Sequence, residues 1–234
     1  MNDAIPILLV PGLGCSPRLF GPQLPSLWQF GPVTLADTRR DDSMVSISQQ
    51  ILATAPPVFA LAGLSMGGYI AFEIMRQAPE RVRRLALLDT AARSDRPEQT
   101  ERRNMQIAMV HDGRFAEIPD LLFPLMVHAD RQQDEELRRI FRQMCHENGA
   151  DAFIQQQEAI KGRPDSRPTL AAISCPTLVL VGDGDQATPP DASREIAEGI
   201  RGARLVIVPD CGHLSTLEQP DAVTHALTEW ISGG

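Results

Sequence analysis

The chain contains the stretch Phe59-Ala60-Leu61-Ala62-Gly63-Leu64-Ser65-Met66-Gly67-Gly68, in which an apolar run passes directly into a glycine-rich turn. The apolar residues 58–62 are typical of a short buried strand, and the pattern of residues 69–75 predicts a helix. Between them lies a Gly-x-Ser-x-Gly pentad, residues 63–67. A strand, this pentad and a helix in succession predict a sharp turn that presents a serine hydroxyl to solvent.

The two outer glycines of the pentad have a steric reason to be there. Ser65 would adopt a strained backbone conformation, and side chains two residues before and after it would collide across so tight a turn. The helix that begins at Met66 would point its first N–H groups at the place where negative charge develops. Such pentads also arise by chance in many proteins, so the pentad alone leaves an ordinary turn as an alternative.

The composition is that of an ordinary folded domain. Of the 234 residues, 43% are hydrophobic and 22% are charged, which is usual for a globular protein with a core of useful size. The net charge is −8 and Lys161 is the only lysine, so we expect no nucleic-acid partner, because a phosphate backbone requires a basic face. The apolar runs are of strand length, so we also expect no membrane span.

The cysteines and histidines do not form a metal-binding pattern. There is no Cys-x-x-Cys pair, no His-Glu-x-x-His motif and no phosphate-binding loop, so we expect no metal and no cofactor. The scattered cysteines and the absence of a signal-peptide pattern predict a reduced, cytoplasmic protein. We interpret the cysteines as small buried apolar residues; they are Cys15, Cys145, Cys175 and Cys211.

Continuous apolar runs alternate with helical patterns, which predicts an α/β fold with a mostly parallel sheet covered by helices on both faces. From about residue 91 to residue 172 the alternation stops, and charged and apolar residues mix at helical spacing. We interpret residues 91–172 as an inserted cap of three to five helices, and residues 1–90 and 173–234 as the core. About six strands are expected: Ile5–Val10, Val33–Asp37, Val58–Ala62, Leu85–Asp89, Leu178–Gly182 and Arg204–Pro209.

With these motifs the chain resembles a short member of the α/β-hydrolase superfamily, similar to its small carboxylesterases and enol-lactonases. The resemblance covers nearly the whole length and rests on three motifs in the family's order of serine, acid and histidine. It implies the α/β-hydrolase fold with a helical cap. The antiparallel hairpin that usually precedes the strand ending at Val10 is not expected here.

Ser65 is the expected nucleophile, and a serine hydroxyl needs an adjacent base. We expect that base to be His213, because the segment Cys211-Gly212-His213-Leu214 directly follows the last strand. The other histidines are less suitable, since three lie in the cap and one lies within the terminal helix. These histidines are His111, His128, His146 and His225.

The acid of the triad must orient the imidazole and stabilise its charged form. The family places it three residues after a strand-end glycine, here Gly182, and Asp185 matches that position. Asp183 is a rival, with a loop-capping role as its alternative. Asp89, at the end of the fourth strand, is a second rival, because some members of the superfamily carry the acid there.

The resemblance also implies two backbone donors for an oxyanion, the N–H groups of Met66 and Leu13. The family usually has His-Gly where this chain has Pro11-Gly12, and a backbone donor survives that change. Gly12-Leu13-Gly14 lacks the third glycine of a dinucleotide-binding fingerprint.

The activity implied is that of a serine hydrolase that cleaves carboxylic esters or lactones through an acyl-enzyme. Two alternatives use the same triad: carbon–carbon bond hydrolysis, and a lyase step like that of the menaquinone-pathway synthase of this fold. A non-catalytic binding protein is less suitable, because such proteins often lose the histidine or the acid. The natural substrate and the oligomeric state are left open.

The residues of the cap bear on the substrate. Its apolar side chains can line an acyl slot or form the cap's own core; they include Phe115, Phe123, Met126, Phe141 and Phe153. Its arginines stand beside acidic residues or in helical runs, so we expect them on solvated faces, which favours a neutral ester over a polyanionic substrate. The arginines are Arg93, Arg102, Arg103, Arg114, Arg138, Arg139 and Arg142.

Overall fold

The computed structural model describes residues 4–233, so the predicted core's ends, residues 1–3 and 234, lie outside the described residues. The described residues form a six-stranded sheet of order β2-β1-β3-β4-β5-β6, in which every neighbouring pair is parallel. This confirms the predicted α/β class and the parallel sheet. The strands are β1 (Ile7–Val10), β2 (Val33–Leu35), β3 (Phe59–Leu64), β4 (Val82–Leu88), β5 (Thr177–Gly182) and β6 (Arg204–Val208).

The helices fall into two groups along the chain. Those outside residues 91–172 are α1 (Leu24–Leu27), α2 (Met44–Thr54), α3 (Met66–Gln77), α8 (Pro190–Gly199), α9 (Ser215–Glu218) and α10 (Pro220–Ser232). Those inside that range are α4 (Pro97–His111), α5 (Ile118–Met126), α6 (Glu135–Asn148) and α7 (Ala150–Lys161). The 3₁₀ helices are η1 (Pro17–Gln23), η2 (Pro79–Arg81), η3 (Phe115–Glu117), η4 (Ala129–Arg131) and η5 (Arg167–Ala172).

The largest difference from the predicted strand boundaries is at β4. This strand begins at Val82 rather than at Leu85, because Val82 pairs with Phe59 of the neighbouring strand. The two arginines that follow Val82 interrupt the apolar run and conceal the start of the strand in the sequence. Pairing across the sheet, rather than local hydrophobicity, decides the start of this strand.

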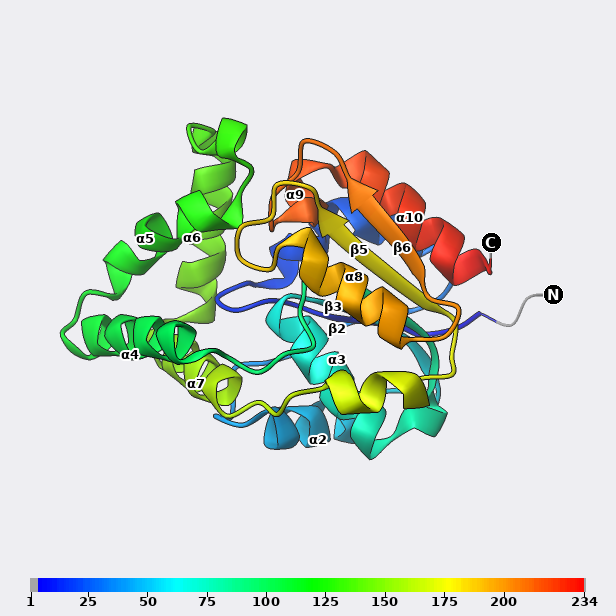
Figure 1. Cartoon of the computed structure of the whole chain (residues 1–234). Helices are drawn as coiled ribbons and strands as arrows, with labels where there is room; N and C mark the ends of the chain where they lie inside the picture. The colour runs from blue at the N-terminus through cyan, green and yellow to red at the C-terminus, as the bar shows by residue number, and fades with distance from the viewer. Residues whose placement is uncertain (1–3, 234) are drawn as a thin grey trace.

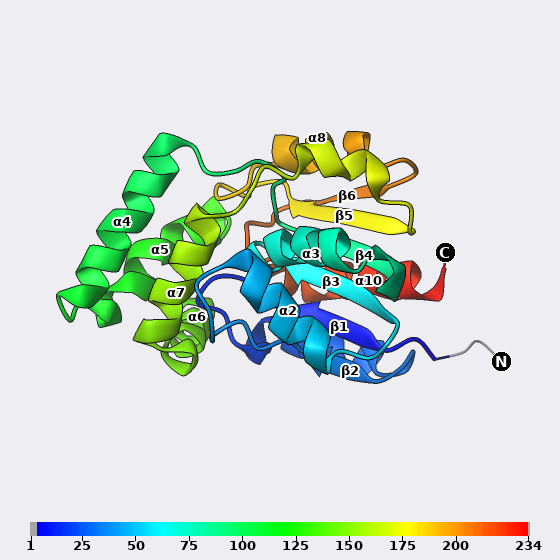
Figure 2. The ribbon, with the colours of Figure 1, turned by 90° about the horizontal axis from the view of Figure 1, so that it is seen from below.

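Side chains that alternate along β1 enter two different apolar clusters. Ile7 and Leu9 pack on one face of the sheet, and Leu8 and Val10 pack on the other. This follows from the period of two in a strand. Helices α1 and α10 contribute to the first cluster and helices α2, α3 and α8 to the second, so both faces are covered (Figures 1 and 2).

Helices α4 to α7 lie together beyond the carboxyl ends of the strands, at the left of Figures 1 and 2. They are not an isolated bundle, because Phe123, Phe141 and Phe153 share an apolar cluster with Leu9 and Leu64 of the sheet. Four α-helices in residues 91–172 agree with the three to five expected there. The division of the chain into a core and a cap domain stays a prediction.

Strand β3 passes into helix α3 through a single strained residue. Ser65 has φ 55° and ψ −115°, a conformation that costs about 1–3 kcal/mol in a non-glycine residue. A Cβ on Gly63 would overlap the carbonyl oxygen of Gly67, and a Cβ on Gly67 would overlap the carbonyl oxygen of Val10. The Thr90 hydroxyl donates to the carbonyl oxygen of Ser65 at 2.8 Å. Close backbone contacts and this hydrogen bond hold the strained turn.

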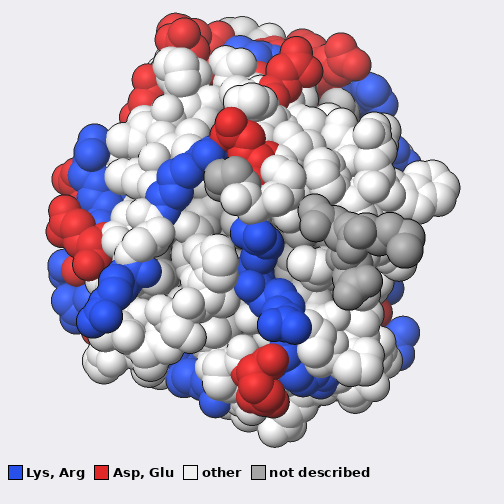
Figure 3. Space-filling view, turned by 90° about the vertical axis from the view of Figure 1, so that its right-hand side faces the viewer, with Lys and Arg blue, Asp and Glu red and all other residues white. Residues whose placement is uncertain are grey.

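The face of the molecule that carries both chain ends lies opposite helices α4 to α7. Basic and acidic side chains occur there in small groups separated by uncharged surface (Figure 3). Within residues 4–233, none of the helices combines the length and the apolar character that crossing a bilayer requires.

Replacing Gly67 by Ala should lower the melting temperature by roughly 4 °C or more, because the new Cβ meets a backbone carbonyl that cannot rotate away. Circular dichroism during thermal unfolding measures this. Gly21→Ala is the matched control, because a Cβ on Gly21 meets nothing within 4 Å. Equal melting temperatures for the two variants would contradict the close approach of α3 to β1.

Candidate active site

Ser65, His213 and Asp185 form one hydrogen-bonded line, although they come from three distant parts of the chain. The Nε2 atom of His213 lies 2.8 Å from Oγ of Ser65, and its Nδ1 atom lies 2.8 Å from Oδ2 of Asp185. The three residues follow strands β3, β6 and β5, whose carboxyl ends meet at one edge of the parallel sheet. His213 and Asp185 are buried, whereas Ser65 is partly exposed.

The carboxylate of Asp185 is held by several donors. Its Oδ1 atom accepts the backbone N–H groups of Ala187 at 2.8 Å and Thr188 at 2.9 Å. Its Oδ2 atom accepts the Thr188 hydroxyl at 2.8 Å and also contacts the ring of His213. These bonds fix the orientation of the carboxylate toward Nδ1 of the imidazole.

The two rival acids make different contacts. Asp183 accepts the N–H of Cys211 at 3.2 Å, which is the loop-capping contact considered as its alternative. Asp89 accepts the N–H of Gly182 at 3.0 Å and the hydroxyl of Ser215. Within the described residues, neither rival forms a hydrogen bond with the imidazole.

Asp89 nevertheless lies close enough to affect the charges of the site. Its burial is the main reason that its pKa is raised well above the usual range, and the negative charge of Asp185 raises it further. Asp89 therefore retains its proton at pH values where an exposed aspartate is ionised. A protonated Asp89 still makes its contacts with β5 and with Ser215.

The pKa of His213 reflects two opposing effects. Burial disfavours the charged imidazolium, but the charge and hydrogen bond of Asp185, together with smaller contributions from Asp89 and Glu218, outweigh it, so the pKa of His213 is raised. Below that pKa, Nε2 carries a proton and cannot accept one from Ser65. A neutral ring, able to act as a base, is present only above it.

Glu218 is a buried residue of the site that sequence reasoning missed. Its carboxylate accepts the N–H groups of Gly212 at 3.1 Å and Leu214 at 3.2 Å, on either side of the histidine. It also accepts the N–H of His128 at 2.8 Å, which lies between α5 and α6. Glu218 thus fixes the histidine loop and ties helices α5 and α6 to it. The sequence signal available for Glu218 is the Ser-x-x-Glu pattern of residues 215–218, which is typical of the start of a helix.

The predicted backbone donors lie beside the serine. A Cβ on Gly12 would be 3.3 Å from the Cβ of Ser65, so the loop after β1 passes directly over the serine. The N–H groups of Leu13 and Met66 have no hydrogen-bond partner among the described residues. Unpartnered N–H groups beside the reacting oxygen are what an oxyanion site requires.

A buried glutamine, which sequence reasoning also missed, holds this loop. Gln156 of α7 is fully buried, and its Oε1 atom accepts the N–H of Gly14 at 2.9 Å and a side-chain N–H of Asn148 at 3.1 Å. Its Nε2 atom donates to the hydroxyl of Thr38 at 3.0 Å. The amide connects α7 to two loops of the sheet. Gln156 is the middle one of three consecutive glutamines, so no local pattern singles it out.

A pocket of about 120 Å³ lies beside Ser65. One side is formed by the loops and helix that carry the hydrogen-bonded line, and the other side is formed by α4, α5 and α7. Helix α5 contributes apolar side chains from Leu122, Leu125 and Met126. Of the five apolar residues considered for an acyl slot, Met126 therefore lines the pocket, whereas the phenylalanines pack in pairs away from it: Phe115 with Phe153, and Phe123 with Phe141.

The expectation that the arginines of residues 91–172 lie on solvated faces is wrong for Arg103 and Arg138, whose side chains are each 17% exposed, whereas Arg102 is exposed. Arg102 and Arg103 of α4 line the pocket with Ser65. The buried residues of α4 are Ile107 and Val110, while Met105 of the same helix is 54% exposed. Of the remaining arginines, Arg139 is exposed. The other four pair with carboxylates outside the pocket: Arg93 with Glu195, Arg114 with Glu117, and both Arg138 and Arg142 with Asp120.

The cysteines match their interpretation as small buried residues. Cys15, Cys145 and Cys211 are buried, and Cys175 is partly buried. Burial raises the pKa of all four thiols, that of Cys145 to about 12. Their thiolates are therefore scarce at neutral pH. In residues 4–233, His, Cys, Asp and Glu side chains do not gather in groups of three or more that could hold a metal ion.

The sequence profile of the alpha/beta hydrolase family matches residues 7–226. This chain belongs to that family. The malate-bound structure of a thermophilic esterase from Thermogutta terrifontis matches this alpha/beta hydrolase with a TM-score of 0.88 and 30% identity, over 98% of this chain and 90% of that chain. An enol-lactonase from Burkholderia xenovorans matches it with a TM-score of 0.87 and 26% identity, over 99% and 92% of the two chains.

Relatives of this alpha/beta hydrolase differ in what their names say they cleave. A pimeloyl-(acyl-carrier protein) methyl ester esterase from Nitrosomonas europaea is 27% identical over 186 residues, which are 77% of this chain and 74% of the relative. A 2-hydroxy-6-oxononadienedioate/2-hydroxy-6-oxononatrienedioate hydrolase from Klebsiella pneumoniae is 30% identical over 178 residues, 74% and 62% of the two chains. Hydrolytic activity is common to these names, and the substrate is not.

The pKa of His213 should lie above the value of about 6.5 for an unperturbed histidine, and Asp185→Asn should lower it, because burial then lacks the opposing carboxylate. An NMR titration of the ring measures both values. Asp183→Asn is the matched control and should change the pKa far less. An equal decrease in the two variants, or a wild-type pKa below 6.5, would contradict this electrostatic arrangement.

Proposed function

We propose that this alpha/beta hydrolase cleaves carboxylic esters or lactones through an acyl-enzyme, with Ser65 as the nucleophile, His213 as the base and Asp185 as the acid. The observation that carries the proposal is the hydrogen-bonded line from Asp185 through His213 to Ser65, which ends in a pocket. Similarity to an esterase and an enol-lactonase supports the choice of substrate class.

In the first half of the reaction, Oγ of Ser65 attacks the carbonyl carbon while Nε2 of His213 takes the hydroxyl proton. The carbonyl oxygen becomes an oxyanion that accepts hydrogen bonds from the N–H groups of Leu13 and Met66. Each such donor is worth about 10²–10³ in turnover in measured cases. Asp185 stabilises the imidazolium that forms. The imidazolium then gives its proton to the leaving alcohol as the carbon–oxygen bond breaks.

In the second half, a water molecule takes the position of the alcohol. His213 removes a proton from this water, which attacks the acyl carbon, and the same two N–H groups stabilise the second oxyanion. When the bond to Ser65 breaks, the proton on Nε2 returns to Oγ. The products are a carboxylic acid and an alcohol, and the three side chains regain their starting states.

We retain carbon–carbon bond hydrolysis as a second candidate function. The Klebsiella pneumoniae relative, which is 30% identical, is named as a hydrolase of an oxo-dioate, a substrate class without an ester bond in its name. The same serine, base and oxyanion donors serve both reactions. The products distinguish the two reactions. Ester hydrolysis releases an acid and an alcohol, whereas hydrolysis of a carbon–carbon bond releases an acid and a product whose leaving carbon has gained a proton. The lyase alternative has no observation of its own in its favour.

Replacing Ser65 by Ala should abolish ester hydrolysis and leave the fold intact, because only the attacking oxygen is lost. Turnover of short p-nitrophenyl esters and circular dichroism measure the two properties. A fluorophosphonate probe should label the parent protein and not the variant. Retained hydrolysis in the variant, with labelling at another residue, would refute the proposed nucleophile.

Replacing Gln156 by Leu should lower kcat by about tenfold or more with little change in KM, because Gly14 loses the acceptor that holds the loop bearing Leu13. Steady-state kinetics on a p-nitrophenyl ester separate the two constants. Gln155→Leu is the matched control, because Gln155 makes no side-chain hydrogen bond among the described residues. A Gln156→Leu variant with unchanged kcat would show that this amide does not position the loop for catalysis.

A further inference from the structure

Helix α4 presents a polar face to the pocket. Gln99, Arg102, Arg103 and Gln106 all line it, and their spacing of three and four residues places them on one side of the helix. The lining contains two guanidinium groups and no aspartate or glutamate side chain. Helix α5 contributes apolar side chains to the same pocket. A molecule bound beside Ser65 therefore meets an apolar surface from α5 and a cationic surface from α4.

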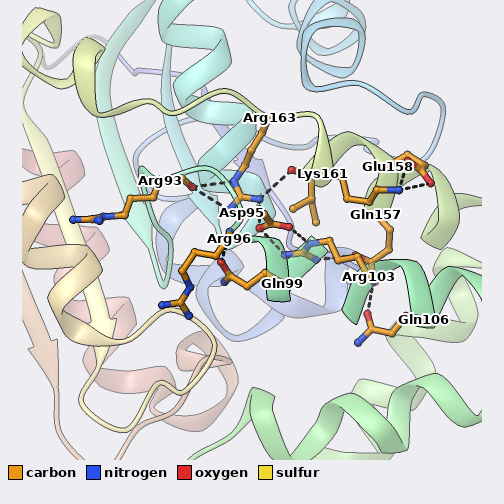
Figure 4. Close-up of polar contacts among 11 residues, drawn as sticks. Arg93, Asp95, Arg96, Gln99, Arg103, Gln106, Gln157, Glu158, Lys161 and Arg163 are labelled. Carbon is orange, nitrogen blue, oxygen red and sulfur yellow. Dashed lines mark hydrogen bonds and ion pairs between the residues drawn. The ribbon is translucent and has the colours of Figure 1, made fainter. Parts of the chain in front are cut away.

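Positive charge is in excess among Asp95 and the three arginines that lie nearest to it and to the pocket, Arg102, Arg103 and Arg163. Asp95 pairs with Arg103 at 2.6 Å and with Arg163 at 2.6 Å, so one carboxylate serves two guanidinium groups (Figure 4). Although burial opposes its ionisation, the two arginines hold the pKa of Asp95 below its usual value, so it is charged. Arg102 forms no ion pair with any described residue. Three guanidinium groups and one carboxylate leave two positive charges in excess.

The two pocket arginines differ in how firmly they are held. Arg103 is fixed by Asp95 and by the side-chain oxygen of Gln157 at 2.7 Å. Arg163, behind it, is buried against the ring of Tyr69, which itself lines the pocket, with its guanidinium carbon 4.1 Å from the ring centroid. Arg102 is exposed and able to turn toward a bound anion. The face thus combines one positioned guanidinium with one that is adaptable.

The chemistry of these groups selects the ligand. Guanidinium groups bind carboxylates through paired hydrogen bonds, and side-chain amides supply further donors. A neutral acyl chain gains nothing from this face, whereas a carboxylate enclosed without such partners would be costly. The pocket of about 120 Å³ is of the order of the roughly 150 Å³ cavity that holds benzene in an engineered protein, so the bound group is short.

We propose that Arg102 and Arg103, with Gln99 and Gln106, form a carboxylate-binding subsite, and that the preferred substrate is a short ester or lactone that carries a carboxylate. The reacting carbonyl lies at Ser65, the chain passes along the apolar wall of α5, and the carboxylate is bound by α4. This inference rests on the proposed function. It replaces the neutral ester expected from the sequence.

The test compares two methyl esters of the same chain length, monomethyl glutarate and methyl pentanoate, which differ by a terminal carboxylate. Methanol release gives kcat/KM for each ester. The wild type should prefer the anionic ester, and Arg102→Gln should reduce the ratio of the two kcat/KM values about tenfold, as expected for a charged hydrogen bond. Arg139→Gln, which removes an exposed arginine that does not line the pocket, should leave the ratio unchanged.

Direct binding separates failure of the subsite from failure of the proposed reaction. Calorimetry should show glutarate binding to the wild type about tenfold more tightly than to Arg102→Gln, with pentanoate binding more weakly than glutarate to the wild type. If neither ester is hydrolysed but this difference in glutarate binding is observed, the subsite stands and the esterase proposal is wrong. If the ester ratio and glutarate affinity are the same in the wild type and in Arg102→Gln, the subsite is refuted.

Discussion

The close backbone contact between helix α3 and strand β1, at Gly67 and Val10, is the constraint on which the arrangement of the site depends. Without a side chain at Gly67, the N-terminus of α3 can approach the carbonyl oxygen at the end of β1. That approach brings the loop after β1 directly over Ser65, so that N–H groups from two separate elements lie beside one hydroxyl. The strained backbone of Ser65 is the energetic cost, and close packing around the turn offsets it.

Buried carboxyl groups organise the part of the site that surrounds His213. Three carboxyl groups lie around His213, and each has a different environment. Asp185 contacts the ring, burial raises the pKa of Asp89, and Glu218 accepts N–H groups on both sides of the histidine. Burial and the neighbouring charge of Asp185 both disfavour a negative charge on Asp89, and Asp185 alone of these three carboxyl groups forms a hydrogen bond with the imidazole. The same arrangement ties the histidine loop to the segment between α5 and α6.

Helices α4 to α7 do more than cover the pocket. Helix α7 fixes the loop bearing Leu13 through Gln156, and helix α4 supplies the cationic wall. The apolar side chains of α5 to α7 anchor these helices to the sheet. Asp95 and Gln157 hold Arg103 in place, whereas Arg102 is exposed and has to be ordered when a ligand binds.

Much of this protein is already determined by local sequence. Each strand, the turn at Ser65 and each of the three motifs that carry the serine, the acid and the histidine depend on residues within a few positions of one another. Periodicity and motif spacing therefore predict them. Which acid contacts His213, and which buried glutamine holds the loop bearing Leu13, depend on contacts between segments more than a hundred residues apart or on the detailed path of a loop. The orientation of α4 has the same origin. Its Ile107 and Val110 are buried, as the amphipathic rule expects, and its pocket-lining side chains are polar: Gln99, Arg102, Arg103 and Gln106. Only the tertiary structure therefore decides that two arginines lie beside the serine.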